Sequence, residues 1–277
     1  MQVSVSSYSF SKMKNSPLEC LRLAKEWGFA AIEFTEVDMD TAGQLREESD
    51  RLNFPILGYT IGADFLQAES VETEAERLYD QVEIAQVLGV QKMRHDASRG
   101  FKAPHNAHTS FAEALPLLAK GCRLVTEYAA ERGIITSVEN HGFFCQDSAR
   151  VAALVGAVNH PNFGVLVDIG NFLCADEDPA KATGNLAAMA KHVHAKDFHV
   201  KPGTEDNPGH GWFQSRGGNF LRGSIIGHGN VPVRQCLGNL KRAGYDGYVS
   251  IEFEGMEDCE TALRLGLANL ERFIELA

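Results

Sequence analysis

The sequence contains few cysteines, and none of them has the spacing that usually gives cysteine a function. Six cysteines are scattered over 277 residues without a Cys-x-x-Cys pair. This pattern argues against a disulfide framework or a thiolate zinc site and is typical of reduced thiols in a core. No apolar run approaches the roughly 18 residues needed to cross a bilayer, and the polar start MQVSVSSYSF does not resemble a signal peptide. We therefore expect a cytoplasmic protein with no membrane partner.

Basic residues are also scarce. The chain has 26 Lys and Arg against 37 Asp and Glu, a formal net charge of −11, and it contains no Lys/Arg-rich block. This balance argues against binding to nucleic acid or anionic membranes, because such partners attract basic patches. It remains compatible with an enzyme that takes a small molecule, and homo-oligomerisation is left open.

The chain alternates between strand-like and helix-like patterns without a linker or low-complexity segment. Helical periodicity lies between runs rich in β-branched and aromatic residues. Eight such runs are expected to be strands: 3–6, 31–34, 56–60, 91–94, 134–139, 163–168, 192–197 and 248–252. Repeated βα units with right-handed crossovers close most simply as a (β/α)₈ TIM barrel, here one α/β domain over residues 1–277. An open doubly wound sheet is less favoured, because no Gly-x-Gly-x-x-Gly follows the first strand.

One long segment, at about residues 199–231, is rich in Gly and Pro and lies between the seventh and eighth predicted strands. Its composition predicts an irregular loop, and loops of this length in compact domains are usually functional or disordered. Its glycines, aromatic residues and arginines predict a lid that closes over a bound ligand.

Polar, metal-binding residue types end four successive predicted strands. The apolar run GIITSV leads directly into Glu139, and burying that carboxylate would be costly unless another group paired with it. Asp168 ends the sixth strand, His192 and His194 lie on the seventh, and Glu252 ends the eighth. The carboxyl ends of all strands in a TIM barrel meet on one face, so these groups are expected to converge there.

Three carboxylates and one imidazole form a set that suits Mn²⁺, Mg²⁺, Co²⁺ or Zn²⁺ with room for substrate. Residues two apart on a strand share a face, so His192 and His194 point the same way. His194 lies nearer the carboxyl end and is the better candidate ligand, whereas His192 is expected to pack or to support it.

The motifs SVENHG, VDIGN, HVHAKD, GHGNVPV and AGYDGYVSIEFEG resemble, along the whole chain, the sugar isomerases and epimerases with a xylose-isomerase-like barrel. The resemblance covers ketose 3-epimerases, hydroxypyruvate isomerase and enzymes of inositol catabolism. It implies one divalent metal ion, most often Mn²⁺, held by Glu139, Asp168, His194 and Glu252. It also implies that Glu139 and Glu252 are the acid/base pair. Asn171 stands where several ketose epimerases have a histidine, and Val200 stands where they have an arginine.

The implied reaction is proton abstraction beside a carbonyl, through an enediolate, on a sugar or sugar phosphate. Return of the proton to the same carbon gives epimerisation, and return to the neighbouring carbon gives isomerisation. A lyase or dehydratase acting on a keto-sugar, keto-glycoside or keto-acid is the alternative, because an enediolate can expel a β-substituent. An abasic-site endonuclease and a sugar-binding barrel without turnover are less favoured. The residues expected to contact substrate are His141, Asn171, His199, Trp212, Arg222 and His228.

Overall fold

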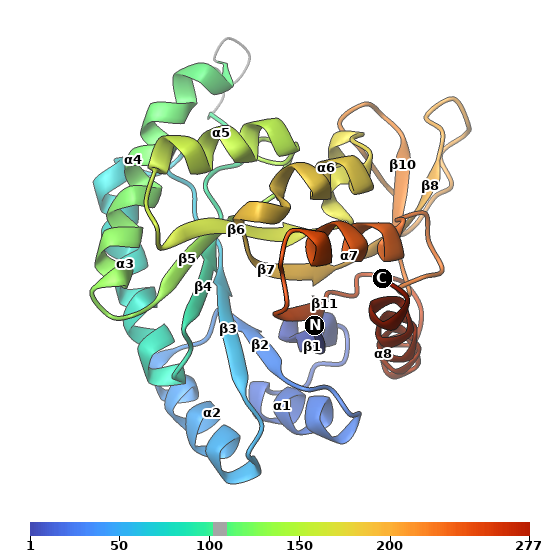
Figure 1. The fold of residues 1–277 in the computed structure, drawn as a ribbon, viewed down its shortest axis with the longest axis horizontal. Coiled ribbons are helices and arrows are strands. Elements are labelled where there is room, and N and C mark those ends of the chain that lie inside the picture. The colour runs from blue at the N-terminus through green and yellow to red at the C-terminus, as the bar shows by residue number, and fades with distance from the viewer. Residues whose placement is uncertain (102–109) are drawn as a thin grey trace.

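The computed structural model describes residues 1–101 and 110–277. In it, eight short strands with alternating apolar side chains form a closed parallel barrel (Figure 1). The strand order around the barrel is β1-β11-β7-β6-β5-β4-β3-β2. The barrel strands are β1 (Gln2–Ser6), β2 (Ile32–Thr35), β3 (Ile56–Ile61), β4 (Lys92–His95), β5 (Ile135–Glu139), β6 (Phe163–Asp168), β7 (Ala190–Ala195) and β11 (Tyr248–Ile251). Each predicted strand corresponds to one of these, which confirms the expected TIM barrel.

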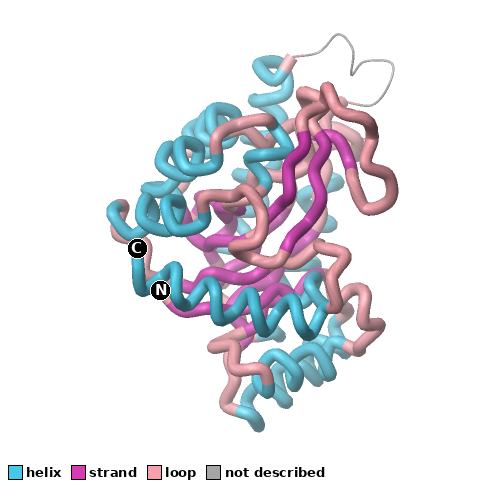
Figure 2. Tube along the Cα trace, turned by 90° about the vertical axis from the view of Figure 1, so that its right-hand side faces the viewer, coloured by secondary structure: helices cyan, strands magenta, loops and turns pink. Residues whose placement is uncertain are grey.

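The described part of the chain forms eight α-helices around the barrel, and Figure 2 shows helices packed along its outside. The helix α1 begins with a capping box in which Ser16 and Glu19 satisfy each other's backbone N–H groups, with Pro17 in the first turn. None of the described helices is long and apolar enough to span a bilayer. The helices are α1 (Pro17–Glu26), α2 (Met39–Leu52), α3 (Val71–Leu88), α4 (Phe111–Ala130), α5 (Ser148–Val158), α6 (Pro179–Leu186), α7 (Val233–Arg242) and α8 (Cys259–Leu276), with short 3₁₀ helices at Ser7–Phe10, Asn171–Ala175 and Ala187–Met189.

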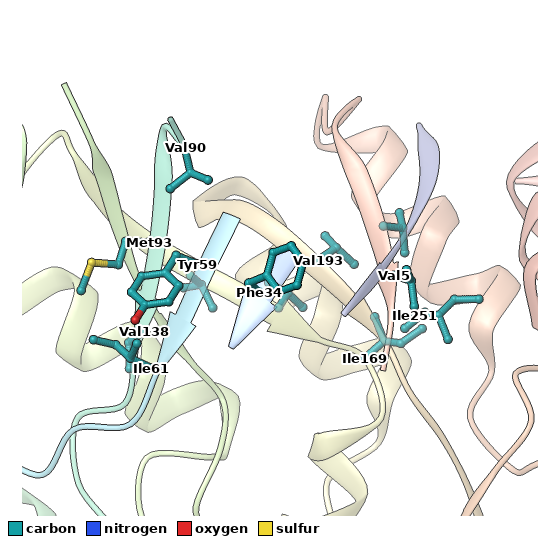
Figure 3. Close-up of a cluster of buried hydrophobic side chains, with 14 of the residues drawn as sticks. Val5, Phe34, Tyr59, Ile61, Val90, Met93, Val138, Ile169, Val193 and Ile251 are labelled. Carbon is teal, nitrogen blue, oxygen red and sulfur yellow. The ribbon is translucent and has the colours of Figure 1, made fainter. Parts of the chain in front are cut away.

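The apolar core lies between the strands and the helices, whereas the inside of the barrel is polar. Alternate strand residues such as Val5, Phe34 and Ile251 are buried in the apolar cluster drawn in Figure 3. The residues between them include Glu33 on β2 and His194 on β7, which contact each other. Because β11 and β1 separate β7 from β2 in the strand order, this contact must cross the barrel interior. Branched aliphatic residues usually fill that space.

Parts of the segment expected to be an irregular lid form an antiparallel sheet, and residues 202–212, 215–219 and 225–231 lie outside its strands. Its strands are β8 (Asp197–Lys201), β9 (Phe213–Gln214) and β10 (Phe220–Ser224), with β10 in the middle. Several of the glycines read as hinges serve close packing, because a Cβ added at Gly223 would lie 2.5 Å from the backbone of Glu254. These glycines allow backbones to approach each other, and closure of the segment over a ligand stays a prediction.

Candidate functional site

The four predicted ligands meet at the carboxyl end of the barrel. Glu139 and Asp168 are the last residues of β5 and β6, His194 lies on β7, and Glu252 directly follows β11. One ligand atom from each lies within 4.8 Å of the others. The side chains of Glu139, Asp168 and His194 are at most 3% exposed, and that of Glu252 is 13% exposed. Parallel strands in register therefore place these groups around one point, as strand order alone suggested.

Two unpaired atoms in this cluster indicate what the cluster is built to hold. Asp168 accepts hydrogen bonds from the N–H groups of Gly170 and Asn171 through Oδ1, but its buried Oδ2 receives none from the described residues. The Nδ1 atom of His194 is likewise buried without a hydrogen bond there. Buried polar atoms are normally paired. A carboxylate oxygen and an imidazole nitrogen that take part in no hydrogen bond among the described residues, beside two further carboxylates, fit a divalent cation.

Electrostatics support the same interpretation. Burial is the main cause that raises the pKa of Asp168 to about 6; Lys196 opposes the shift, and the carboxylates of Glu139 and Glu252 add to it. Crowding several acidic groups in a space of low polarity is unfavourable without positive charge. A bound cation would remove this penalty.

Two cations that sequence analysis did not assign to the cluster partly neutralise it. Arg94 on β4 lies 2.5 Å from Glu139 Oε2 and also pairs with Asp96. The Lys196 ammonium lies 2.6 Å from Glu252 Oε2 and 3.4 Å from Asp168 Oδ2. A basic residue two positions beyond a predicted ligand was the available signal for Lys196. Arg94 gave little signal, since its strand ends in the unremarkable tripeptide MRH.

Asn171 and His141 lie beside the cluster. The Asn171 amide donates to Glu139 Oε1 at 2.9 Å, and its oxygen accepts from Lys196 at 3.2 Å, so it links the two sides of the site. His141 Nδ1 lies 3.2 Å from Asp96 Oδ1. Burial would lower the pKa of His141, but the hydrogen bond to Asp96 and the charge of Asp96 raise it above its usual value.

Two adjoining cavities open at this end of the barrel. The first, of about 300 Å³, contains the cluster residues Glu139, His194 and Glu252 in its wall. The second, of about 280 Å³, is lined by Asn171 and Lys196 and by the rings of Phe143, Phe198 and Phe213. His141, Arg99 and Glu254 line both. The cluster therefore opens into a larger space with an apolar wall on one side.

Four of the predicted substrate contacts line neither cavity. Trp212 packs against the cations of Lys201 and Arg222, and Arg222 pairs with Glu257 at 3.2 Å. His199 faces Arg222 in the β8–β10 pair, and His228 is exposed in the turn after β10.

Asp197 explains the placement of this turn, because its carboxylate accepts the backbone N–H groups of residues 227, 229 and 231. Phe213, not Trp212, is the aromatic residue of this segment beside the site.

Comparison with known proteins agrees with this architecture. Curated proteins give no match. The probable 3-DHS dehydratase AsbF, involved in petrobactin synthesis, from Bacillus anthracis has a TM-score of 0.77 at 19% identity, over 98% of this chain and 99% of its own. An L-ribulose 3-epimerase has a TM-score of 0.74 at 18% identity, over 99% and 97%. A xylose isomerase-like TIM-barrel protein from Mycobacterium smegmatis, in complex with magnesium, has a TM-score of 0.74 at 15% identity, over 99% and 97%.

At these identities the structural matches establish the fold, and the sequence match establishes the family. The family model described as xylose isomerase-like TIM barrel matches residues 21–273, a range that includes all four cluster residues. The chain therefore belongs to the xylose isomerase-like TIM-barrel family.

Proposed function

We propose that this protein is a divalent-metal-dependent isomerase or epimerase that removes a proton next to the carbonyl of a sugar or sugar phosphate. The observation that carries this proposal is the pairing of Glu139 and Glu252 in one buried cluster with Asp168 and His194. Two carboxylates that face a common point can take a proton from a substrate and return one. The ketose epimerase among the structural neighbours supports the same reaction class.

The cluster would hold one metal ion, which we propose to be Mn²⁺, with Mg²⁺, Co²⁺ or Zn²⁺ as substitutes. Two of the ligand atoms would be Asp168 Oδ2 and His194 Nδ1, which make no hydrogen bond with a described residue, and Glu139 and Glu252 would complete the set. When bound, such an ion polarises a carbonyl and stabilises the oxyanion that forms as the proton leaves. A neighbour with the same fold is in complex with magnesium, which supports the choice of a divalent ion.

The surrounding residues of the chain orient the acid/base pair. Arg94 and Asn171 each bind one oxygen of Glu139, at 2.5 Å and 2.9 Å, and so fix the plane of its carboxylate. The Lys196 ammonium lies 2.6 Å from Glu252 Oε2. The two glutamates are therefore positioned by different partners, as expected if each handles the proton from its own direction.

Solvent exchange tests this proposal. The Mn²⁺-loaded protein, incubated in heavy water with a panel of free and phosphorylated ketoses, should introduce deuterium at the carbon beside the carbonyl of at least one sugar. Glu139→Gln and Glu252→Gln should each lower this exchange by about a hundredfold or more. Glu205→Gln, which changes an exposed glutamate paired with Lys201, is the control and should exchange normally. Exchange retained in either cluster variant with metal still bound would remove that residue from the acid/base role.

The second cavity favours a lyase or dehydratase as the other candidate. Its wall includes Phe143, a non-glycine residue at φ 66° whose N–H is held by Gln146 at 2.7 Å. Backbone conformations of this kind persist where the surroundings enforce them, often at ligand sites. A leaving group could lie against Phe143 and Phe213 while Lys196 donates a hydrogen bond to the departing oxygen. The dehydratase among the neighbours supports this option.

Product analysis separates the two candidates. An epimerase or isomerase gives sugars of unchanged mass, plus deuterium from the solvent. A lyase or dehydratase gives an unsaturated carbonyl product that absorbs in the ultraviolet and a released alcohol or water. Phe213→Ala should impair turnover of a substrate with a bulky substituent far more than that of a small ketose if the second cavity holds the leaving group.

A further inference from the structure

A carboxylate that sequence analysis passed over lies at the centre of the barrel. Glu33 on β2 is fully buried, with no exposed surface. It stands between Ile32 and Phe34, whose side chains belong to the apolar core. The cost of burying an unpaired carboxylate is high, so its partners must compensate for it. Those partners are the two histidines of β7.

Each of the two histidines contacts a different oxygen of the Glu33 carboxylate. His192 Nε2 lies 2.8 Å from Glu33 Oε2 and 3.0 Å from the hydroxyl of Ser250. His194 Nε2 makes a short contact with Glu33 Oε1. Each carboxylate oxygen thus faces one ring nitrogen, and an ionised carboxylate can only accept hydrogen bonds. Both histidines must therefore present an N–H from Nε2.

The other nitrogen of His194 faces the metal cluster. His194 Nδ1 lies 3.7 Å from Glu252 Oε2 and 3.9 Å from Glu139 Oε1, without a hydrogen bond to a described residue. A neutral imidazole has one N–H and one lone pair. If Glu33 requires the proton on Nε2, the lone pair is left on Nδ1, aimed at the point where the four ligands converge.

Glu33, His192 and His194 also have the composition of a metal site, with ligand atoms within 4.8 Å of one another. Their geometry argues against that role. Tetrahedral ligands about 2.0–2.2 Å from an ion are separated from each other by more than 3 Å. Here the 2.8 Å contact and the shorter one between nitrogen and oxygen leave no space for an ion. These distances are those of direct hydrogen bonds.

We propose that Glu33 is a positioning residue that holds His194 in the tautomer with the proton on Nε2, so that Nδ1 is ready to bind the metal ion. The inference rests on the proposed metal site and adds to it the group that prepares one ligand. His192 completes the arrangement by binding Glu33 Oε2, and Ser250 contacts His192 Nε2. Carboxylates behind a metal-binding histidine commonly change metal affinity by 10–100-fold.

Metal titration is the first test. Mn²⁺ affinity, measured by calorimetry or against a competing chelator at constant pH, should fall about 10–100-fold in Glu33→Gln. Glu48→Gln is the matched control, because Glu48 is a buried glutamate on α2 that is held by Arg22 and Arg51. It should bind Mn²⁺ like the wild type. Glu33→Gln that binds Mn²⁺ within twofold of the wild type would overturn the inference.

A second measurement needs no variant of Glu33 and so does not depend on its folding. In ¹⁵N-histidine-labelled protein loaded with diamagnetic Zn²⁺, correlation spectra should show His194 with a protonated Nε2 and an unprotonated Nδ1. The signal is assigned with His194→Gln. A proton on Nδ1, or an unprotonated Nε2, would overturn the positioning role. If the wild type binds neither Mn²⁺ nor Zn²⁺, the proposed function fails together with this inference. Normal metal binding with the other tautomer overturns the inference alone.

Discussion

The ammonium nitrogen of Lys196 lies 2.6 Å from Glu252 Oε2, in a region where the lysine side chain is 2% exposed and the glutamate side chain 13% exposed. The same ammonium lies 3.4 Å from Asp168 Oδ2, so it bridges two of the four candidate metal ligands. Within the barrel, Lys196 and a bound cation would compete for the same negative charge. Like charges a few ångströms apart repel strongly where water is excluded.

Removing the Lys196 charge should therefore raise the affinity for the metal ion and destabilise the metal-free protein. We expect Lys196→Met to raise Mn²⁺ affinity by about tenfold or more, which corresponds to roughly 1.4 kcal/mol. The melting temperature of the metal-free protein should fall, because the acidic cluster loses its internal cation. Calorimetric titration and thermal unfolding with and without Mn²⁺ measure both effects. Lys201→Met, an exposed lysine on β8, should change neither, and equal or weaker Mn²⁺ binding by Lys196→Met would contradict the argument.

Metal stoichiometry tests the cluster itself. We expect one divalent ion per chain in the wild type and at least a hundredfold weaker Mn²⁺ binding in Asp168→Asn or His194→Asn, because each variant removes one of four ligand atoms. Elemental analysis after equilibrium dialysis provides the count. His160→Asn is the control, since His160 lies in the loop before β6, at the opposite end of that strand from Asp168. Full metal occupancy in both cluster variants would exclude this ligand set.

The backbone of Gly170 lies so close to that of Lys196 that a side chain at position 170 should not fit. A Cβ at this position would lie 2.5 Å from the carbonyl oxygen of Lys196, on the neighbouring strand connection. Gly170→Ala should lower the free energy of unfolding by about 1–3 kcal/mol, the usual cost of overpacking. Urea denaturation checks this value. Gly156→Ala offers the contrast, because a Cβ there meets nothing within 4 Å inside α5, and we expect it to add about 0.5–1 kcal/mol. Equal stability of the two alanine variants would count against the close approach.

Part of the loss of folding stability at low pH should come from protonation of Glu48. Hydrogen bonds from Arg51 and then Arg22 lower the pKa of Glu48 from 4.5 to about 2. A carboxyl group with a depressed folded-state pKa stabilises the fold fully above its unfolded value and loses that contribution as pH falls through the folded value. The stability difference between wild type and Glu48→Gln should thus be constant from pH 8 to 5 and shrink between about pH 4.5 and 2. A difference that stays constant down to pH 2 would mean that the two arginines do not stabilise ionised Glu48.

The barrel and the four-residue cluster were predictable for the same reason. Short buried strands have strong local signals, and parallel closure brings their carboxyl ends together whatever the loops do. Asp168 and Glu252 could thus be placed near each other although they are far apart in the chain. Strand order and the positions of the strand ends are sufficient for this placement.

Glu33 and the β8–β10 pair could not be predicted in that way. Glu33 reads as a single acidic residue inside an apolar strand, and its partner His194 lies 161 residues away across the barrel. Only the closed interior, which no local pattern reveals, explains the burial of that carboxylate. The strand β9 has only two residues, β10 contains Gly223, and the turn between them is rich in Gly, so the register of both depends on pairing within the sheet and has little local signal.

The carboxylate of Asp197 has a consequence for how quickly molecules exchange with the site. It accepts backbone N–H groups from Gly227, Gly229 and Val231, and its own neighbour Phe198 donates to it as well. Moving the turn at residues 227–231 would break several hydrogen bonds to one carboxylate at once, so we expect this end of the antiparallel sheet to stay in place. We therefore expect entry and departure without a slow opening step. The residence time of a product would then depend on how tightly the polar residues of the site bind it. Turnover should be insensitive to solvent viscosity.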